Sequence, residues 1–82
     1  QEQTTRALEN TAKVFEAAGT SMANAIKCTV FLTEVADFGG MNQAYRAFFP
    51  DSPPARSTVV VKALVVPNAT VEIECLAVIP KG

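Results

Sequence analysis

Five ionisable side chains lie in strand-like, otherwise apolar stretches: Lys27, Arg56, Lys62, Glu72 and Glu74. A charge on such a strand is costly to bury unless it is paired, solvated or bound to a ligand. Among the five, only the arginine offers a rigid planar fork that can bind a carboxylate through two parallel hydrogen bonds. A glutamate nearby could hold or deprotonate a water molecule. These residue types therefore favour recognition of a small carboxylate combined with water chemistry.

The missing residue types exclude other chemistries. The sequence contains no histidine, which removes an imidazole base, a Ser-His-Asp triad and a histidine metal site. It also has no CxxC pair, no acidic run spaced like a calcium loop, and no glycine-rich loop after a strand. We therefore expect neither a metal nor an organic cofactor. The net charge of −1 gives no electrostatic attraction to nucleic acid or to an anionic membrane.

Two stretches with helical spacing must position these residues. The first covers residues 3–18 and is expected to end at Gly19, since glycine readily adopts the conformation that follows a helix. Its apolar stripe is predicted to contain Leu8, Ala12, Val14, Phe15 and Ala18. The second covers residues 38–49. Its stripe, which we assign to the core and not to a cofactor site, consists of Phe38, Met41, Tyr45 and Phe48.

Three stretches rich in β-branched residues predict strands at residues 23–32, 54–61 and 71–78. The order is helix, strand, helix, strand, strand, and the strand–helix–strand unit implies a parallel pair. The first strand is apolar on both faces, which predicts a central strand covered on both sides. The 82 residues form one domain, and their 49% hydrophobic content favours an oligomer.

Both cysteines, Cys28 and Cys75, lie in predicted strands. They could form a disulfide, but we favour free core thiols in a reducing compartment. The sequence shows no secretory signal and no apolar run long enough to span a bilayer. These features predict no membrane association and a cytoplasmic location, or a mitochondrial one in a eukaryote.

Five motifs along the chain carry a family resemblance. They are QTTRALEN at 3–10, FEAAG at 15–19, KCTVFL at 27–32, MNQAYRAFFP at 41–50, and PARSTVVV at 54–61 followed by VEIECLAV at 71–78. In this order they resemble the RidA/YjgF family of reactive-intermediate (enamine/imine) deaminases, over nearly the whole chain. The resemblance implies a chorismate-mutase-like α+β fold with a mixed sheet and two helices on one face. It also implies that the N-terminal strands of the family are not part of residues 1–82.

The resemblance further implies a homotrimer with active-site clefts between neighbouring subunits. Within it, Arg56 matches the arginine that binds the substrate carboxylate, and Glu72 matches the glutamate that positions water. Asn42 matches a polar position near the cleft. Thr58, which we include with Arg56 and Asn42 among the expected substrate-binding residues, stands where many members have cysteine, so a thiol nucleophile is excluded there. The implied ligand is a small carboxylate-bearing imine or keto acid.

Structural roles compete with each of these assignments. Arg56 could form an ion pair at the start of a strand, and Glu72 could pair across strands with Lys62. Glu74 shares the strand face of Glu72 and suits a structural or interface role. For Asn42, hydrogen bonds on the helix surface or to a loop are an equal alternative to ligand contact.

The local pattern predicts a hairpin that turns near Pro67 and Asn68. In that hairpin Arg56 and Glu72 would lie roughly 20 Å apart, at about 3.3 Å per strand residue. The topology implied by the family instead places residues 71–78 antiparallel to residues 23–32. In both arrangements Arg56 and Glu72 lie at opposite ends of the sheet, so they could share a site only across a subunit boundary.

Three functions are therefore under consideration. The first is hydrolysis of small amino-acid-derived enamines and imines to a keto acid and ammonia. The second is a non-catalytic trimer that senses keto acids or binds a partner. The third, an endoribonuclease activity also attributed to the family, is disfavoured by the absence of histidine and by the net charge of −1.

Overall fold

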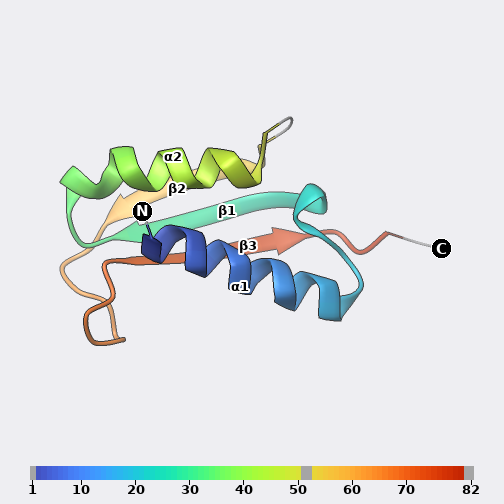
Figure 1. The fold of residues 1–82 in the computed structure, drawn as a ribbon, viewed down its shortest axis with the longest axis horizontal. Coiled ribbons are helices and arrows are strands. Elements are labelled where there is room, and N and C mark those ends of the chain that lie inside the picture. Colours follow the sequence, from blue (N-terminus) through green and yellow to red (C-terminus); the bar gives the residue numbers. More distant parts are fainter. Residues whose placement is uncertain (1, 51–52, 81–82) are drawn as a thin grey trace.

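The computed structural model describes residues 2–50 and 53–80. It shows a three-stranded mixed sheet with two α-helices on one face (Figure 1). The order helix, strand, helix, strand, strand is as predicted. The elements are α1 Glu2–Ala18, β1 Ala25–Leu32, α2 Phe38–Phe48, β2 Ala55–Val60 and β3 Val71–Ala77, with short 3-10 turns at Met22–Asn24 and Val35–Asp37. Within the described residues, neither helix combines the length and the apolar character that crossing a membrane requires.

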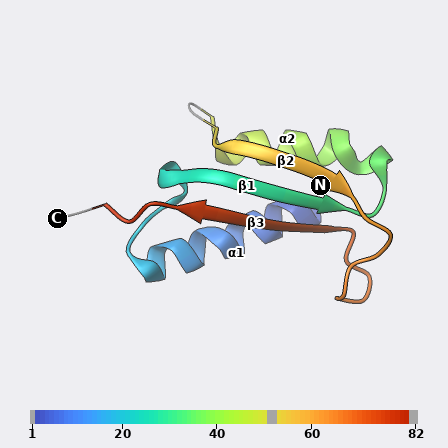
Figure 2. The same ribbon diagram turned by 180° about the vertical axis from the view of Figure 1, so that it is seen from behind.

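The strands are ordered β2-β1-β3, so β1 is central, as its apolar sequence predicts. β1 and β2 are parallel, and α2 connects them. β3 runs antiparallel to β1 and not to β2, so the hairpin favoured by the local pattern is wrong and the topology implied by the family is confirmed. Residues 61–70 therefore pass from one edge of the sheet to the other (Figure 2).

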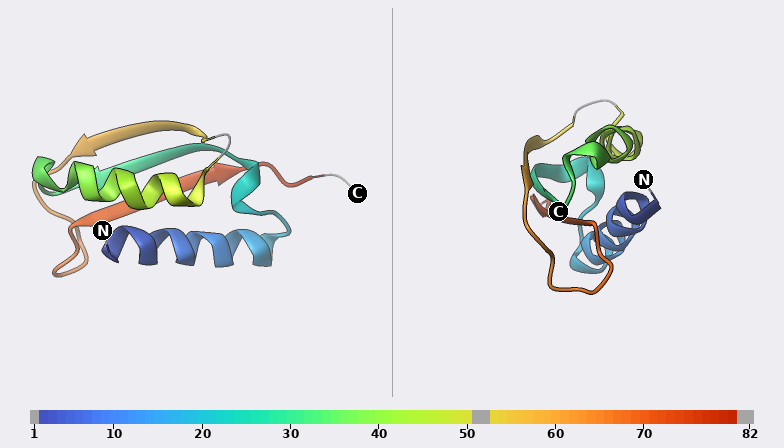
Figure 3. Two further views of the ribbon diagram at one scale, coloured as in Figure 1. Left: turned by 45° about the horizontal axis from the view of Figure 1, so that its top comes forward. Right: turned by 90° about the vertical axis from the view of Figure 1, so that its left-hand side faces the viewer.

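The core lies between the sheet and the helices, which form a second layer on one side of it (Figure 3). Its cluster of buried side chains consists of Leu8, Cys28, Val30, Leu32, Met41, Tyr45 and Phe49. Successive strand residues point to opposite faces, so Cys28, Val30 and Leu32 enter this core while Lys27, Thr29 and Phe31 face the other way. The prediction that both faces of β1 are covered is therefore wrong for the described residues. Among the described residues, no helix covers the face of the sheet opposite to α1 and α2 (Figure 2).

The first helix ends as its glycine predicts. Gly19 has φ +91, and the amide of Thr20 donates to the carbonyl of Phe15 at 2.9 Å while that of Gly19 donates to Glu16 at 3.1 Å. This pair of bonds satisfies carbonyls that the last turn would otherwise leave unpaired. The predicted stripe is wrong at two positions, since Val14 is 66% exposed and Ala18 is also exposed.

Cys28 and Cys75 form a disulfide between β1 and β3, with their Cα atoms 4.0 Å apart. The prediction of free core thiols is therefore wrong. The two residues lie directly opposite each other in the antiparallel β1–β3 pair. The sequence separation of 47 residues gives no local sign of this pairing, which depends on the non-local strand order.

Candidate functional site

The candidate site is centred on Arg56, the second residue of β2. Alternation along the strand directs its side chain, like that of Thr58, toward the helix-covered face. There its Nη1 atom donates a hydrogen bond to the Oδ1 atom of Asn42 on α2, at 2.6 Å. The guanidinium carbon lies 4.9 Å from the ring centroid of Tyr45 and 5.5 Å from that of Phe38. One helix thus surrounds the arginine of the edge strand with an amide and two aromatic rings.

This environment holds the charge of Arg56 without neutralising it. Among residues 2–50 and 53–80, the one ion pair joins Arg6 to Glu2, so Arg56 has no carboxylate partner there. The aromatic faces stabilise a nearby cation by about 0.5–2 kcal/mol, and less where water reaches it. The guanidinium has five N–H donors, and the amide oxygen of Asn42 engages one of its nitrogens. The remaining N–H groups can donate hydrogen bonds to an anionic ligand.

A cavity of ≈ 530 Å³ opens beside this arginine. Its described lining carries two arginines and no acidic residue. The lining residues are Asn42, Tyr45, Arg46, Phe49, Pro50, Pro53, Pro54 and Arg56. Its size and positive charge suit a small anion such as a keto acid or an imino acid.

Two buried oxygens near the arginine have no hydrogen-bond partner in the described part of the chain: the hydroxyls of Tyr45 and Thr58. Tyr45 is only 2% exposed, and burial raises the pKa of its phenol above the usual 10, with the positive charge of Arg56 opposing part of that shift. The phenol therefore stays protonated at neutral pH. Thr58 lies two residues after Arg56 on the same strand face, so its side chain lies on the helix-covered side of the sheet, but it does not line the cavity.

Glu72 is not brought to this site within one chain. It lies exposed on β3 opposite Phe31, whereas Arg56 on β2 lies beside Cys28. Cys28 and Phe31 belong to opposite faces of β1 and lie three residues apart. Arg56 and Glu72 therefore occupy opposite edges, different levels and opposite faces of the sheet. Of the four predicted site residues, the structure gathers Arg56, Asn42 and Thr58 on one face and leaves Glu72 on the other.

The alternative structural roles can be compared with these contacts. In the described residues, neither Arg56 nor Glu72 forms the ion pair considered for it. Lys62 lies beyond the end of β2 and not opposite Glu72. Glu74 does share the face of Glu72, and it is paired with Thr29 of β1. For Asn42, the hydrogen bond joins α2 to Arg56, a partner that the sequence alone did not suggest.

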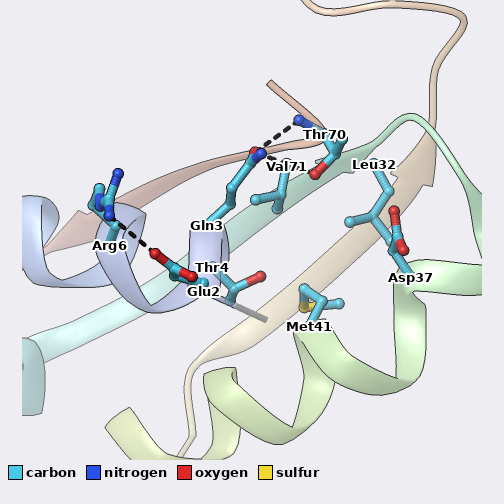
Figure 4. A pocket seen from close by; sticks show the side chains of 9 residues that line it. All are labelled: Glu2, Gln3, Thr4, Arg6, Leu32, Asp37, Met41, Thr70 and Val71. Atoms are coloured by element: carbon cyan, nitrogen blue, oxygen red, sulfur yellow. Dashed lines mark hydrogen bonds and ion pairs between the residues drawn. The ribbon is translucent and has the colours of Figure 1, made fainter. Parts of the chain in front are cut away.

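A second cavity, of ≈ 390 Å³, lies near the start of α1 (Figure 4). It contains none of the predicted site residues, and several of its polar groups are engaged with one another. Arg6 pairs with Glu2 at 3.2 Å, and the side chain of Gln3 accepts a hydrogen bond from the backbone of Thr70 at 2.8 Å. The first contact lies within α1, and the second attaches α1 to the segment that leads into β3. We therefore assign this cavity a structural role.

Phe38 and Tyr45 are site residues that the sequence interpretation assigned to the core alone. Tyr45 is buried as predicted, but Phe38 is 39% exposed and its ring lies beside the guanidinium. The signal was present in the spacing, because positions 38, 42 and 45 fall on one helix face, with a polar residue between two aromatic ones. What the sequence could not provide was the partner of that face.

The fold and the site define a class: an α+β domain whose two helices cover one face of a mixed sheet, with an arginine at its parallel edge that has no carboxylate partner among the described residues. A sequence profile described as Endoribonuclease L-PSP matches residues 1–79. The chain belongs to this family, the RidA/YjgF family that its motifs resemble.

Curated relatives share about two fifths of their aligned residues with the chain. It is 38% identical over 77 residues to the rat protein named 2-iminobutanoate/2-iminopropanoate deaminase, covering 94% of the chain and 56% of that protein. It is 40% identical over 77 residues to the chloroplastic Reactive Intermediate Deaminase A of Arabidopsis thaliana, covering 94% of the chain and 41% of that protein. The mitochondrial protein mmf2 of Schizosaccharomyces pombe is 40% identical over 79 residues, covering 94% and 63%. The chain thus spans roughly half the length of these relatives.

Solved structures agree with the fold. The YjgF gene product from E. coli superposes with a TM-score of 0.86 at 37% identity, covering 92% of this chain and 61% of that one. Yeast Mmf1 superposes with a TM-score of 0.81 at 33% identity, covering 85% and 55%. The RidA-type fold is therefore established for this chain.

Proposed function

We propose that the protein hydrolyses small enamines and imines derived from amino acids, such as 2-aminoacrylate and 2-iminopropionate, to a keto acid and ammonia. The observation that carries this proposal is the Arg56 guanidinium, which is half-buried beside a cavity with no carboxylate partner in the described residues. The names of the rat and Arabidopsis relatives point to the same reaction class.

Imine hydrolysis requires few functional groups from the protein. The Arg56 fork binds the substrate carboxylate, which fixes the position of the adjacent imine carbon. Thr58 is proposed as a further substrate-binding residue because it shares the strand face of Arg56, although its buried hydroxyl does not line the cavity within one chain. Water adds to the C=N carbon, the resulting carbinolamine expels ammonia, and the carbon–oxygen bond becomes the ketone. Since imines hydrolyse unaided, orientation and one acid/base group are sufficient.

Glu72 is the proposed group that positions the water. Because it lies on the far face of the sheet within its own chain, it would act from a neighbouring copy, in a cleft between subunits of a homotrimer. The uncovered sheet face supports such a contact, since it presents Phe31 together with Val59, which is 43% exposed, and Leu76, which is 63% exposed. A mass measurement of the intact assembly tests the copy number. The proposed compartment is the cytoplasm, or the mitochondrion in a eukaryote.

The decisive experiment compares the complete wild-type protein with Arg56→Ala in an assay of 2-iminopropionate hydrolysis. Loss of a charged hydrogen-bonding anchor is expected to lower kcat/KM by about tenfold to more than a hundredfold. Arg6→Ala is the matched control, because Arg6 is an exposed arginine that does not line the cavity, and its loss should leave the rate unchanged. Equal rates for wild type and Arg56→Ala would refute the proposal.

A second candidate is a protein that binds keto acids without turning over an imine. The observation in its favour is that one chain holds the anchor but not the acid/base group on the same face. Arg56-dependent binding of 2-ketobutyrate by a protein that does not accelerate imine hydrolysis would support this candidate. Cleavage of RNA that survives Arg56→Ala would favour neither proposal and would agree instead with the activity named in the family description.

A further inference from the structure

Three side chains of α2 enclose the guanidinium of Arg56 from one helix face. Asn42 lies at its centre with the hydrogen bond of 2.6 Å, and Phe38 and Tyr45 lie four residues before it and three residues after it. Residues at this spacing project from the same side of a helix. The orientation of the anchor is therefore set by a rigid element and not by the strand that carries it.

The chemistry of Asn42 matters as much as its position. A guanidinium only donates hydrogen bonds, so the amide must turn its oxygen toward Arg56 and its Nδ2 donor away. A neutral acceptor at this distance fixes the plane of the guanidinium through a charge-assisted bond. It does so without adding negative charge, which leaves the positive charge for the ligand. An aspartate of the same shape would satisfy the same nitrogen but would also neutralise it.

We propose that Asn42 is a positioning residue, which aims the Arg56 fork at the ligand and keeps the site selective for carboxylates because its own side chain is uncharged. This inference rests on the proposed function, in which Arg56 binds the carboxylate of the substrate. It differs from a direct ligand contact by Asn42, since here Asn42 acts through Arg56 alone.

The first test replaces the amide by a carboxylate in the complete protein. Asn42→Asp is expected to weaken binding of 2-ketobutyrate by about a hundredfold, since it places an intramolecular competitor on the guanidinium, whereas Asn42→Ala, which only loosens the arginine, should weaken it by about tenfold. The uncharged amide of the same keto acid should bind the wild type weakly and should lose little affinity in Asn42→Asp. Calorimetric titration gives these affinities, and circular dichroism confirms that each variant is folded.

The second test separates positioning from contact. If Asn42 acts through Arg56, the double variant Asn42→Ala/Arg56→Ala binds 2-ketobutyrate no more weakly than Arg56→Ala alone. If Asn42 touches the ligand independently, the two losses add. This comparison also decides the matter if Asn42→Asp fails to fold.

The outcomes distinguish the two levels of the proposal. Wild-type protein that binds 2-ketobutyrate through Arg56, together with an Asn42→Asp variant of equal affinity or with additive losses, would overturn the role of Asn42 and leave the proposed function standing. Wild-type protein whose binding and hydrolysis do not depend on Arg56 would overturn both.

Discussion

The buried hydroxyl of Tyr45 leads to an unusual prediction: removing this polar atom should stabilise the protein. The residue is 2% exposed, and its hydroxyl has no hydrogen-bond partner in the described chain. The ring itself makes two contacts: its centroid lies 4.9 Å from that of Phe49, and its face lies next to the guanidinium of Arg56. Tyr45→Phe keeps both ring contacts and removes only the unpaired hydroxyl.

The magnitude follows from the cost of desolvating that group. An unsatisfied buried polar group costs about 1–3 kcal/mol, of which part returns when the hydroxyl is deleted. A slightly weaker interaction of the cation with a phenylalanine face offsets a fraction of this gain. We therefore expect Tyr45→Phe to raise the free energy of unfolding by about 1 kcal/mol, which corresponds to an increase in Tm of about 2–8 °C depending on the size of the folding unit.

The pH dependence of stability provides a second, independent test of this prediction. Burial raises the pKa of the folded-state phenol above its unfolded value of 10. The folded state then holds the proton more tightly, so wild-type stability from this group is complete below pH 10 and is lost as pH rises through the folded pKa. The advantage of Tyr45→Phe should therefore be constant at neutral pH and should grow above about pH 10.

Urea unfolding of the complete wild type and of Tyr45→Phe, at equal protomer concentration and at pH 7 and pH 10.5, measures both effects. Tyr45→Leu is the matched control, because it removes the same hydroxyl but also both ring contacts, and it should destabilise the protein. If Tyr45→Phe is less stable than the wild type by 1 kcal/mol or more, the hydroxyl has a partner in the assembled protein. That result would refute the claim that burying this hydroxyl costs stability.

Two further predictions concern the disulfide and the proposed acid/base residue. The Cys28–Cys75 bond closes a loop of 47 residues, so its reduction should lower the free energy of unfolding of the wild type by up to about 4 kcal/mol. The same reductant should leave the stability of Cys75→Ala unchanged. If the reductant has no effect on the wild type, the bond does not form in solution. Glu72→Gln should lower kcat by about 10²-fold with unchanged affinity for 2-ketobutyrate, whereas Glu74→Gln on the same strand face should retain activity; equal effects of the two would remove the special role of Glu72.

The elements of the fold could be predicted because they depend on local patterns. Helical spacing and β-branched runs placed each element to within about two residues of its observed bounds. The pairing of β3 could not be obtained in this way. The local turn near Asn68 favours a hairpin with β2, but the hydrogen bonds of β3 are made with β1, which lies far away in the sequence. The Cys28–Cys75 bond was missed for the same reason, since it requires that pairing.

In the candidate site too, local patterns predict some features and non-local packing determines the others. The type of Arg56 and its apolar surroundings predicted a carboxylate anchor, whereas Thr58 was named only through the family resemblance. The partners of the arginine come from α2, and no pattern within β2 indicates which helix face lies over it. Asn42 and the rings beside it were recognisable as one helix face, but their common function depends on how the helix packs.

The separation of Arg56 and Glu72 has a consequence for the proposed assembly. Arg56 lies on the helix-covered face near one edge of the sheet, and Glu72 lies on the uncovered face near the other edge. If both act on one substrate, each contact between copies must join two different surfaces, the β2 edge of one chain and the β3 region of the next. Such a contact is heterologous, whereas a two-fold axis joins the same surface of both copies, so a two-fold dimer does not provide it. It closes as a ring of three or more copies, and the proposed homotrimer is the smallest ring that meets this condition.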